Sequence, residues 1–234
     1  MNILITGAAG GMGGAITQVL SGTKHRLLLQ YHHALPASPK DSLLISADLV
    51  SKSAIQTLIE SVKQAGGADI IIHCATLPIV NDNIWEKSWA TFEQHLKIQV
   101  QPLLMLIHSL VPGMKKKHFG RIIALGSEYT VGRPPGKLAD YITAKYALLG
   151  LVKSLAVELG PFGITANCVS PGLTATHLTR HLPRKYMELV ATQTPRQQLT
   201  LPDDVANLVR FLCAPESGMI SGENILINGG YTMR

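Results

Sequence analysis

The chain has 234 residues, of which 46% are hydrophobic and 15% are charged. This length can bury one sizeable hydrophobic core, and this composition excludes a disordered chain, a coiled coil and a collagen-like fibre. Lys and Arg number 21 against 15 Asp and Glu, a formal charge of +6. That charge favours acidic or phosphorylated ligands, but spread over so long a chain it is no nucleic-acid footprint, so we expect no nucleic-acid partner.

The sequence carries no sign of export or of a membrane span. Met1-Asn2 leads directly into the apolar run Ile3–Ile5, without the basic stretch and long apolar core of an export signal. No apolar run reaches the roughly 20 residues of a membrane-spanning helix. Cys74, Cys168 and Cys213 lack metal-ligand spacing, so we expect reduced, buried thiols and no metal site. These features predict a cytoplasmic protein without a membrane partner.

Short apolar runs alternate with longer amphipathic segments along the whole chain. The expected strands are Asn2–Thr6, His25–Tyr31, Leu43–Ala47, Asp69–Cys74, Arg121–Leu125, Ile164–Val169 and Asn224–Ile227. The expected helices lie near Met12–Leu20, Ser53–Gln64, Thr91–Met114, Tyr141–Leu159 and Pro202–Leu212. Strands that are apolar nearly throughout predict a sheet covered on both faces, and regular alternation with helices predicts parallel strands. Residues 1–234 are therefore predicted to form a single α/β domain, a doubly wound parallel sheet with helices on both faces.

Ligands of such sheets bind at the carboxyl ends of the strands, where the strand order reverses. The first expected strand ends in a glycine-rich turn that opens the first helix, and its spacing of Gly7, Gly11 and Gly13 is that of a nucleotide-binding turn. Without Cβ atoms the backbone can turn sharply and approach a pyrophosphate, whose charge faces a helix N-terminus. The residues expected to contact the nucleotide here are Gly7, Ala9, Gly10, Gly11, Met12 and Gly13.

Two motifs together carry a family resemblance. The pattern Thr-Gly-x-x-x-Gly-x-Gly at residues 6–13 and the run from Tyr141 to Lys145 resemble the single-domain short-chain dehydrogenase/reductase family, over essentially the whole chain. Motifs in the family's order are Asp48-Leu49, Ser127, Pro171-Gly172 and Asn228-Gly229-Gly230. The runs Gly120–Ile123, Gly126-Ser127 and Gly163–Asn167 are most similar to the 3-oxoacyl-carrier-protein reductases of that family. The resemblance implies a Rossmann-type fold, NAD(H) or NADP(H) as cofactor, and a homo-oligomer, a tetramer or a dimer.

The chemistry follows from three side chains. Tyr141 and Lys145 are four residues apart, so on a helix they share one face. A phenol has a pKa of about 10, and a nearby ammonium is expected to favour the phenolate, which makes Tyr141 a proton donor to a carbonyl as hydride arrives. Ser127 can hydrogen-bond the same oxygen. The resemblance adds that Lys145 holds the nicotinamide ribose; without it, an ordinary helix pair and a loop hydroxyl would explain these residues.

Two stretches depart from the family pattern. Gln99 stands where the family has a catalytic Asn that orders a water beside the lysine; its extra methylene could shift or abolish that relay. The family's Asn-Asn-Ala-Gly reads His73-Cys74-Ala75-Thr76 here, which alters the polar lining near the adenine ribose. The resemblance still assigns Cys74 and Ala75 to cofactor binding.

The remaining cofactor residues also come from the resemblance. Asp48 and Leu49 are assigned to the adenine end, with a helix cap as the alternative role for Asp48. Gly172, Thr174 and Thr176 are assigned to the carboxamide and phosphates. The tip of the second strand has no carboxylate to repel a 2′-phosphate, and His32 with His33 could take the place of the basic residue missing from the glycine turn. The sequence therefore favours NADP over NAD.

The segment Thr176–Leu201 has no regular period and is expected to form a substrate lid. Its basic residues suit an anionic substrate or a carrier protein, and equally suit simple solvation. We predict reduction of a small-molecule carbonyl substrate, a ketone such as a carrier-protein- or CoA-linked β-ketoacyl thioester. Two alternatives stay open: an alcohol, sugar or steroid dehydrogenase of the same family, and a non-catalytic nucleotide-binding regulatory or scaffold protein.

Overall fold

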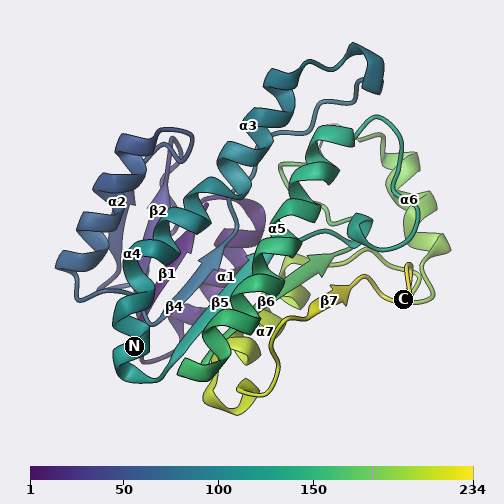
Figure 1. The fold of residues 1–234 in the computed structure, drawn as a ribbon. Helices are drawn as coiled ribbons and strands as arrows, with labels where there is room; N and C mark the ends of the chain where they lie inside the picture. Colours follow the sequence, from purple (N-terminus) through teal and green to yellow (C-terminus); the bar gives the residue numbers. More distant parts are fainter. Residues whose placement is uncertain (181, 234) are drawn as a thin grey trace.

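The computed structural model describes residues 1–180 and 182–233, and the seven strands in this part of the chain form one sheet (Figure 1). The strand order is β3-β2-β1-β4-β5-β6-β7 and each pairing is parallel. The strands are β1 (Asn2–Thr6), β2 (Arg26–Tyr31), β3 (Leu43–Ser46), β4 (Ile70–His73), β5 (Gly120–Leu125), β6 (Ile164–Pro171) and β7 (Asn224–Ile227). This sheet confirms the predicted doubly wound fold.

Helices cover both faces of the sheet. They are α1 (Gly11–Ser21), α2 (Lys52–Gln64), α3 (Trp89–Gln99), α4 (Gln101–Lys117), α5 (Ala139–Leu159), α6 (Arg184–Gln193) and α7 (Pro202–Cys213). Single 3-10 turns lie at η1 (Ile84–Glu86), η2 (Glu128–Thr130), η3 (Gly160–Phe162) and η4 (Pro215–Ser217). Within the described residues, no helix is both long enough and apolar enough to cross a lipid bilayer.

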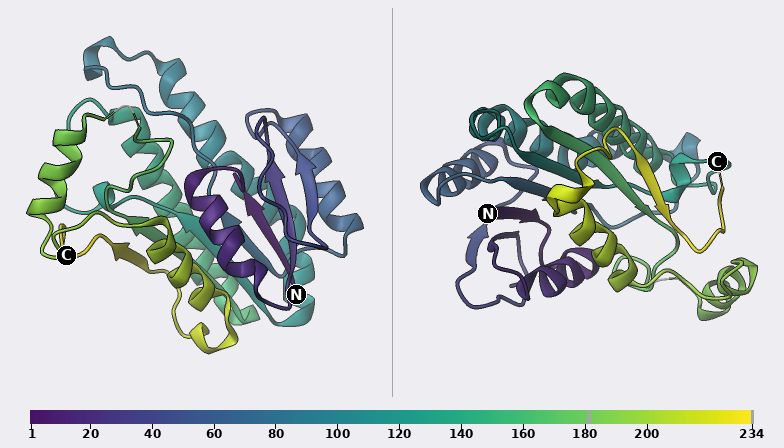
Figure 2. Two further views of the ribbon diagram at one scale, coloured as in Figure 1. Left: turned by 180° about the vertical axis from the view of Figure 1, so that it is seen from behind. Right: turned by 90° about the horizontal axis from the view of Figure 1, so that it is seen from below.

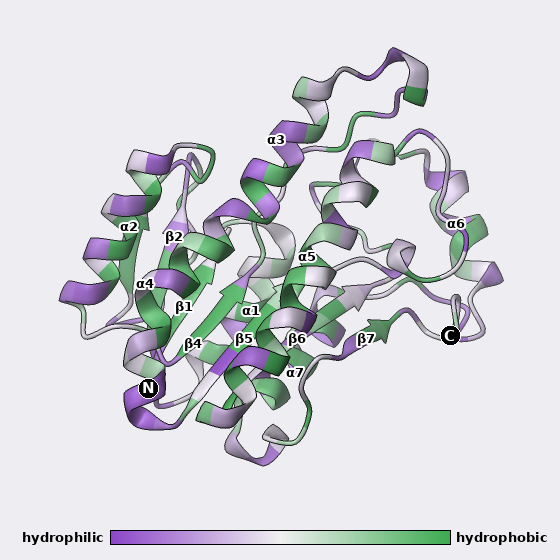
Figure 3. Ribbon diagram, in the orientation of Figure 1, coloured by the Kyte–Doolittle hydropathy of each residue, from purple (hydrophilic) through white to green (hydrophobic). Residues whose placement is uncertain are grey.

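Side chains of each strand alternate between two buried cores, which is why the strands are apolar nearly throughout. Leu4 of β1 packs in the core under α2, α4 and α5, whereas Ile3 and Ile5 pack in the core under α1 and α7. The two views in Figure 2 show the sheet between these helical layers, and Figure 3 shows apolar strands inside and polar outer helix faces. The helical layers cover the two faces of the sheet and leave the ends of its strands for other contacts.

The segment expected as one helix, Thr91–Met114, is two. The helix ends at Gln99 and restarts at Gln101, with Val100 at φ −112° between them. Pro102 lacks a backbone N–H, so it cannot donate to the Ile98 carbonyl and the regular ladder is interrupted there.

The segment at residues 176–201 contains a helix that the sequence did not predict. Helix α6 begins directly after Pro183 and stands apart from the main helical layers at one side of the molecule (Figure 1). The segment is tied to the rest of the fold by a parallel bridge between Thr174 and Thr200. It therefore lies beside the carboxyl end of β6.

Close packing at the glycine turn explains two of its glycines. Gly7 has φ +66°, and a Cβ there would lie 3.0 Å from the Ala75 backbone. A Cβ on Gly13 would lie 2.2 Å from the Gly7 carbonyl oxygen, closer than any real contact. The next residue, Gly14, has only the Ala8 carbonyl at 3.8 Å. The first turn of α1 thus presses directly against the end of β1.

Gly13→Ala should destabilise the fold by about 1–3 kcal/mol, because the methyl group forces the helix away from the strand. Gly14→Ala is the matched control in the same turn, and it should leave stability unchanged or raise it by up to about 1 kcal/mol. Urea unfolding measures both free energies of unfolding. A Gly13→Ala protein as stable as the wild type would contradict this account of the turn.

Candidate active site

The carboxyl ends of β1, β4, β5 and β6 meet at one edge of the sheet, and the strand order reverses between β1 and β4. Such a switch point is where doubly wound sheets bind ligands. The segments that follow these strands carry most of the residues selected from the sequence. A cavity of about 460 Å³ opens at this edge.

The cavity brings together eight residues that the sequence selected. They come from five separate segments: Met12, Cys74, Ser127, Tyr141, Lys145, Gly172, Thr174 and Thr176. Leu182, Pro183 and Tyr186 close it from the segment around α6, whereas Leu138 and Ile79 add apolar walls. The lining is thus apolar with a few converging polar groups, as in most small-molecule sites.

The other expected cofactor residues lie outside this cavity, around the ends of β1, β2, β3 and β4. They are Gly7, Ala9, Gly10, Gly11, Gly13, His32, Asp48, Leu49 and Ala75. The Gln30 side chain ties these ends together: its Oε1 accepts from the Gly7 N–H at 2.8 Å, and its Nε2 donates to the Ala47 carbonyl at 2.7 Å. His32 and His33 are exposed, with ring centroids 3.6 Å apart.

The N-terminus of α1 suits an anionic group. Its N-cap, Gly10, makes no side-chain capping bond, and its first turn has no acidic residue. The free N–H groups and the positive end of the helix dipole therefore remain available to a pyrophosphate. The residues present fit a dinucleotide at this turn.

Asp48 does not cap a helix. Its Oδ1 accepts from the Val50 N–H at 3.0 Å, while the N-cap of α2 is Ser51, whose Oγ accepts from the Ala54 N–H at 3.3 Å. The carboxylate is half-buried beside the buried Leu49. The capping role considered for Asp48 is therefore wrong.

Ser127, Tyr141 and Lys145 are all removed from water. Their exposed fractions are 5%, 7% and 4%. Lys145 Nζ donates to the Leu125 carbonyl at 2.7 Å and lies 5.4 Å from the centre of the Tyr141 ring. The strand end fixes the ammonium, and α5 places both side chains on one face as their spacing predicted.

Burial governs the ionisation of this group. It raises the pKa of Tyr141 to about 12, and a hydrogen bond with Ser127 opposes the rise only in part. The pKa shift is thus opposite in direction to the one expected from the nearby ammonium, because the loss of hydration outweighs it. Burial also lowers the pKa of Lys145 to about 8, although the neighbouring Cys168 and Cys74 partly offset this. Tyr141 consequently holds its proton at neutral pH.

Gln99 is fully buried at the end of α3 and does not line the cavity. Its Nε2 lies 3.2 Å from His95 Nδ1. Its Oε1 is buried without a hydrogen-bond partner among the described residues. The structure therefore places this departure from the family pattern at the helix break, with an unsatisfied acceptor.

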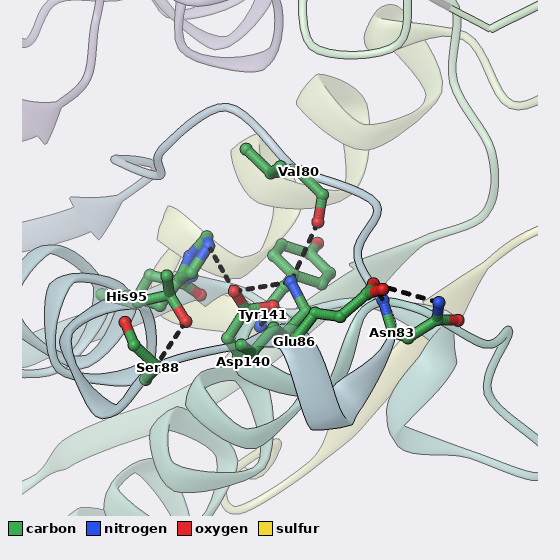
Figure 4. Close-up of polar contacts among 10 residues, drawn as sticks. Val80, Asn83, Glu86, Ser88, His95, Asp140 and Tyr141 are labelled. Carbon is green, nitrogen blue, oxygen red and sulfur yellow. Dashed lines mark hydrogen bonds and ion pairs between the residues drawn. The ribbon is translucent and has the colours of Figure 1, made fainter.

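Sequence reasoning missed a buried polar group beside Gln99, formed by Lys87, His95 and Asp140. Lys87 Nζ donates to Asp140 Oδ2 at 2.9 Å, and His95 Nε2 lies 4.0 Å from the same oxygen. Figure 4 shows His95, Asp140 and Tyr141 converging there. Two local signals exist: Asp140 precedes Tyr141, and His95 lies four residues before Gln99 on the same helix face. Lys87 has no such signal.

Glu128 is a second missed residue, directly after Ser127. It is buried and lines the cavity, and its Oε2 accepts from Asn228 Nδ2 at 3.1 Å. Burial raises its pKa, against the hydrogen bonds that it accepts. This contact fastens the loop after β5 to the one after β7.

His73 stands where the family pattern has Asn, and it is fully enclosed at 1% exposure. Its Nδ1 lies 2.8 Å from Thr6 Oγ1, which also accepts from the Cys74 N–H at 3.3 Å. Burial, reinforced by the Lys145 charge, lowers the pKa of His73 to about 4. The imidazole is therefore neutral and joins the ends of β1 and β4. Among the residues described, no group of three His, Cys, Asp or Glu side chains is placed to hold a metal ion.

Comparisons with known proteins find relatives that match almost the whole chain. The sequence model of the family described as enoyl-(acyl carrier protein) reductase matches residues 7–232. The 3-oxoacyl-[acyl-carrier-protein] reductase of Rickettsia felis is 32% identical over 240 residues, covering 98% of this chain and 96% of that one. The corresponding reductase of Vibrio cholerae is 29% identical over 241 residues, covering 98% and 96%.

Two solved structures share the fold. A 3-ketoacyl-(acyl-carrier-protein) reductase from Brucella melitensis, complexed with NADH, has a TM-score of 0.90 at 24% identity, covering 99% of this chain and 98% of that one. A short chain dehydrogenase family protein from Francisella tularensis has a TM-score of 0.87 at 25% identity, covering 98% of each chain.

A glycine turn at a switch point, with a buried Ser, Tyr and Lys beside it, defines an NAD(P)-dependent oxidoreductase. The chain belongs to the short-chain dehydrogenase/reductase family. Its reaction is the reduction of a ketone to a secondary alcohol, and neither alternative, a sugar or steroid dehydrogenase or a non-catalytic scaffold, is favoured.

In the His73→Asn protein, the free energy of unfolding should decrease less at acidic pH than in the wild type. In the wild type the folded-state pKa is about 4 and the ordinary value 6.5, so protons bind the unfolded chain first as pH falls below 6.5. This one group then removes up to about 3 kcal/mol of stability by pH 4. Urea unfolding at several pH values between these limits compares the two proteins. Equal pH slopes would contradict the shifted pKa.

Proposed function

We propose that the chain reduces a β-ketoacyl thioester, linked to an acyl carrier protein or to coenzyme A, with NADPH as the reductant. The observation that carries this is the burial of Tyr141, Lys145 and Ser127 around one apolar-walled cavity. The names of the most similar relatives support the substrate class. We also infer that residues 1–234 act as one domain, with the segment 176–201 as its lid.

The three buried side chains divide the chemistry between them. The nicotinamide cofactor supplies the hydride when bound. Tyr141 donates its proton to the carbonyl oxygen, since its raised pKa keeps the phenol protonated until charge develops on that oxygen. Ser127 hydrogen-bonds the same oxygen, and Lys145 holds the nicotinamide ribose and stabilises the phenolate that remains. Gln99 takes the place of the family's Asn.

The dinucleotide is held by the residues of the glycine turn and of the three strand ends around it. Gly7, Ala9, Gly10, Gly11, Met12 and Gly13 would hold the pyrophosphate, and Gly172, Thr174 and Thr176 would hold the carboxamide end. Asp48, Leu49, Cys74 and Ala75 would hold the adenine ribose. We assign His32 to the 2′-phosphate of NADPH, because neither it nor its neighbours at the tip of β2 carry a negative charge that would repel a phosphate.

The basic residues differ in how well they could bind a carrier-linked substrate, because some already have partners within the protein. Lys115 lies over the Phe162 ring at 4.0 Å, and Lys117 pairs with Asp69 at 2.6 Å, so both are already engaged at the far end of α4. Arg184 in the lid pairs with Glu188 at 2.8 Å. Arg180 and Lys185, beside the cavity mouth, are the better candidates to meet an acidic carrier or a phosphopantetheine phosphate.

We further propose that the chain is cytoplasmic and assembles as a homo-oligomer, a tetramer or a dimer, through the outer faces of α4 and α5. Large apolar side chains stand exposed there, with exposed fractions of 52% for Leu104, 47% for Tyr146 and 78% for Val157. Apolar surface of this kind on neighbouring helices favours association.

Tyr141→Phe should lower turnover of acetoacetyl-coenzyme A with NADPH by about 10²–10⁴-fold, because the proton donor is lost. Binding of NADPH, followed by its fluorescence, should change little. Tyr146→Phe is the matched control on the same helix, since Tyr146 is exposed and outside the cavity. Turnover that survives in the Tyr141→Phe protein would refute the assigned proton donor.

His32→Asp should reverse the preference for NADPH. A carboxylate at the tip of β2 repels the 2′-phosphate and accepts bonds from the ribose hydroxyls of NADH. We expect the ratio of kcat/KM for NADPH to that for NADH to fall at least about tenfold, or about 1.4 kcal/mol. His118→Asp, at the exposed C-cap of α4, should leave the ratio unchanged. A wild-type protein that favours NADH would overturn the proposal.

A further inference from the structure

A buried chain of polar side chains runs from the loop before α3 to the end of that helix. Lys87 Nζ donates to Asp140 Oδ2 at 2.9 Å and to the Val80 carbonyl at 3.0 Å. His95 Nε2 lies 4.0 Å from the same Asp140 oxygen, and His95 Nδ1 lies 3.2 Å from Gln99 Nε2. This chain of side chains therefore joins the loop before α3, the start of α5 and the end of α3, where Gln99 lies.

All members of this chain are removed from water. The side chains of Lys87, His95 and Asp140 are 1%, 6% and 4% exposed, and Gln99 is fully buried. A buried ion pair adds little stability over an apolar pair of the same size, because both ions lose their hydration. Its benefit is in fixing one arrangement of the side chains around it.

The hydrogen-bond chemistry fixes where the imidazole carries its proton. An amide nitrogen has only N–H donors, so the Nδ1 that faces Gln99 Nε2 must accept and carries no proton. The neutral ring then carries its proton on Nε2, on the side of the Asp140 carboxylate. With its NH₂ group held by His95, Gln99 presents its Oε1 as a buried acceptor that no described residue satisfies.

The Asp140 carboxylate also binds the backbone of Tyr141, the residue proposed as the proton donor. Asp140 Oδ1 accepts from the backbone N–H of Tyr141 at 2.9 Å. The rings of His95 and Tyr141 meet edge to face, 6.0 Å apart at 81°. Figure 4 shows His95, Asp140 and Tyr141 gathered around this carboxylate, with Val80 above it. One anion thus holds the start of the α5 helix and, through His95, the Gln99 amide.

We propose that Lys87, Asp140 and His95 are positioning residues for the reduction, which hold the Gln99 carboxamide in one orientation relative to Tyr141. The inference rests on the proposed function, in which Gln99 replaces the family's Asn. Gln has one more methylene and one more rotatable bond than Asn, so its amide needs a partner to keep a single orientation. His95 supplies that partner, and the Lys87–Asp140 pair holds His95.

The arrangement is sensitive to protonation of His95. A proton on Nδ1 would face the Gln99 NH₂ group, so the amide would have to turn over and its acceptor would leave its place. The groups that face His95 are Asp140, Tyr141 and Lys145 from α5, Lys87 from the preceding loop, and Gln99 from its own helix. Burial lowers the pKa of His95, with the Lys87 and Lys145 charges adding to this effect and the Asp140 charge opposing it. Turnover should therefore fall only as pH drops below 6.5.

His95→Asn tests the positioning role, because Asn is too short to reach Gln99. We expect kcat to fall about tenfold with little change in KM, within the roughly 100-fold that a misplacement of 1 Å costs. The acid limb of the kcat profile that belongs to His95 should disappear. His118→Asn, at the exposed C-cap of α4, is the matched control. A variant that keeps the wild-type kcat and acid limb, with only a lower Tm, would assign His95 a purely structural role and overturn the proposal.

Two further experiments, a double variant and an NMR measurement, test the proposal if His95→Asn does not fold. The double variant Lys87→Met/Asp140→Asn removes both charges together and should also lower kcat without raising KM; an unchanged kcat would overturn the proposal. Nitrogen NMR of the wild-type histidines should show His95 neutral with its proton on Nε2. A proton on Nδ1 would likewise overturn it. Because this readout needs no turnover, it separates failure of the positioning chain from failure of the proposed reaction, which Tyr141→Phe tests.

Discussion

Removal from water is the constraint on which the site depends. Tyr141 and Lys145 face a cavity that ends inside the protein, where the Leu125 carbonyl is the hydrogen-bond partner of the ammonium. Burial moves their two pKa values apart, to about 12 for the phenol and about 8 for the amine. Both shifts favour the neutral form of the group. The phenol thus keeps its proton as an available acid, and the ammonium needs little further perturbation to yield or regain a proton.

The parallel sheet is what makes that burial possible. Because all strands run in one direction, their carboxyl ends present loops to a single edge, and residues as distant as Met12 and Thr176 line one cavity. The tight contact between Gly13 and the Gly7 carbonyl brings the N-terminus of α1 to the same edge. The N-terminus of α1 and the buried phenol of Tyr141 therefore lie at the same edge of the sheet.

Much of this was predictable, because the information is local. Apolar runs with a side chain on each face identified the seven strands of the described residues, and glycines at fixed spacing identified the tight turn between β1 and α1. The break before Pro102 was missed because an apolar period continues through it, although the missing N–H was visible in the sequence. Helix α6 was missed because its polarity is mixed. The direction of the Tyr141 pKa shift was wrong because spacing shows which charges are near and not how much water is lost.

The polar chain beside Gln99 shows why tertiary contacts escape such reasoning. Lys87 and Asp140 are 53 residues apart in sequence, and neither position has a pattern that marks it as buried. The four residues of this polar group nevertheless satisfy one another's hydrogen-bonding and charge requirements, apart from the Gln99 Oε1 acceptor. A longer amide at the end of α3 needs a partner, a histidine one turn earlier supplies it, and a histidine without a fixed tautomer needs a carboxylate. A buried carboxylate in turn needs a cation, which the loop before α3 delivers. Each of these side chains supplies the hydrogen-bond or charge partner that its neighbour requires. Gln99 is therefore best understood together with His95, Asp140 and Lys87, as one structural unit.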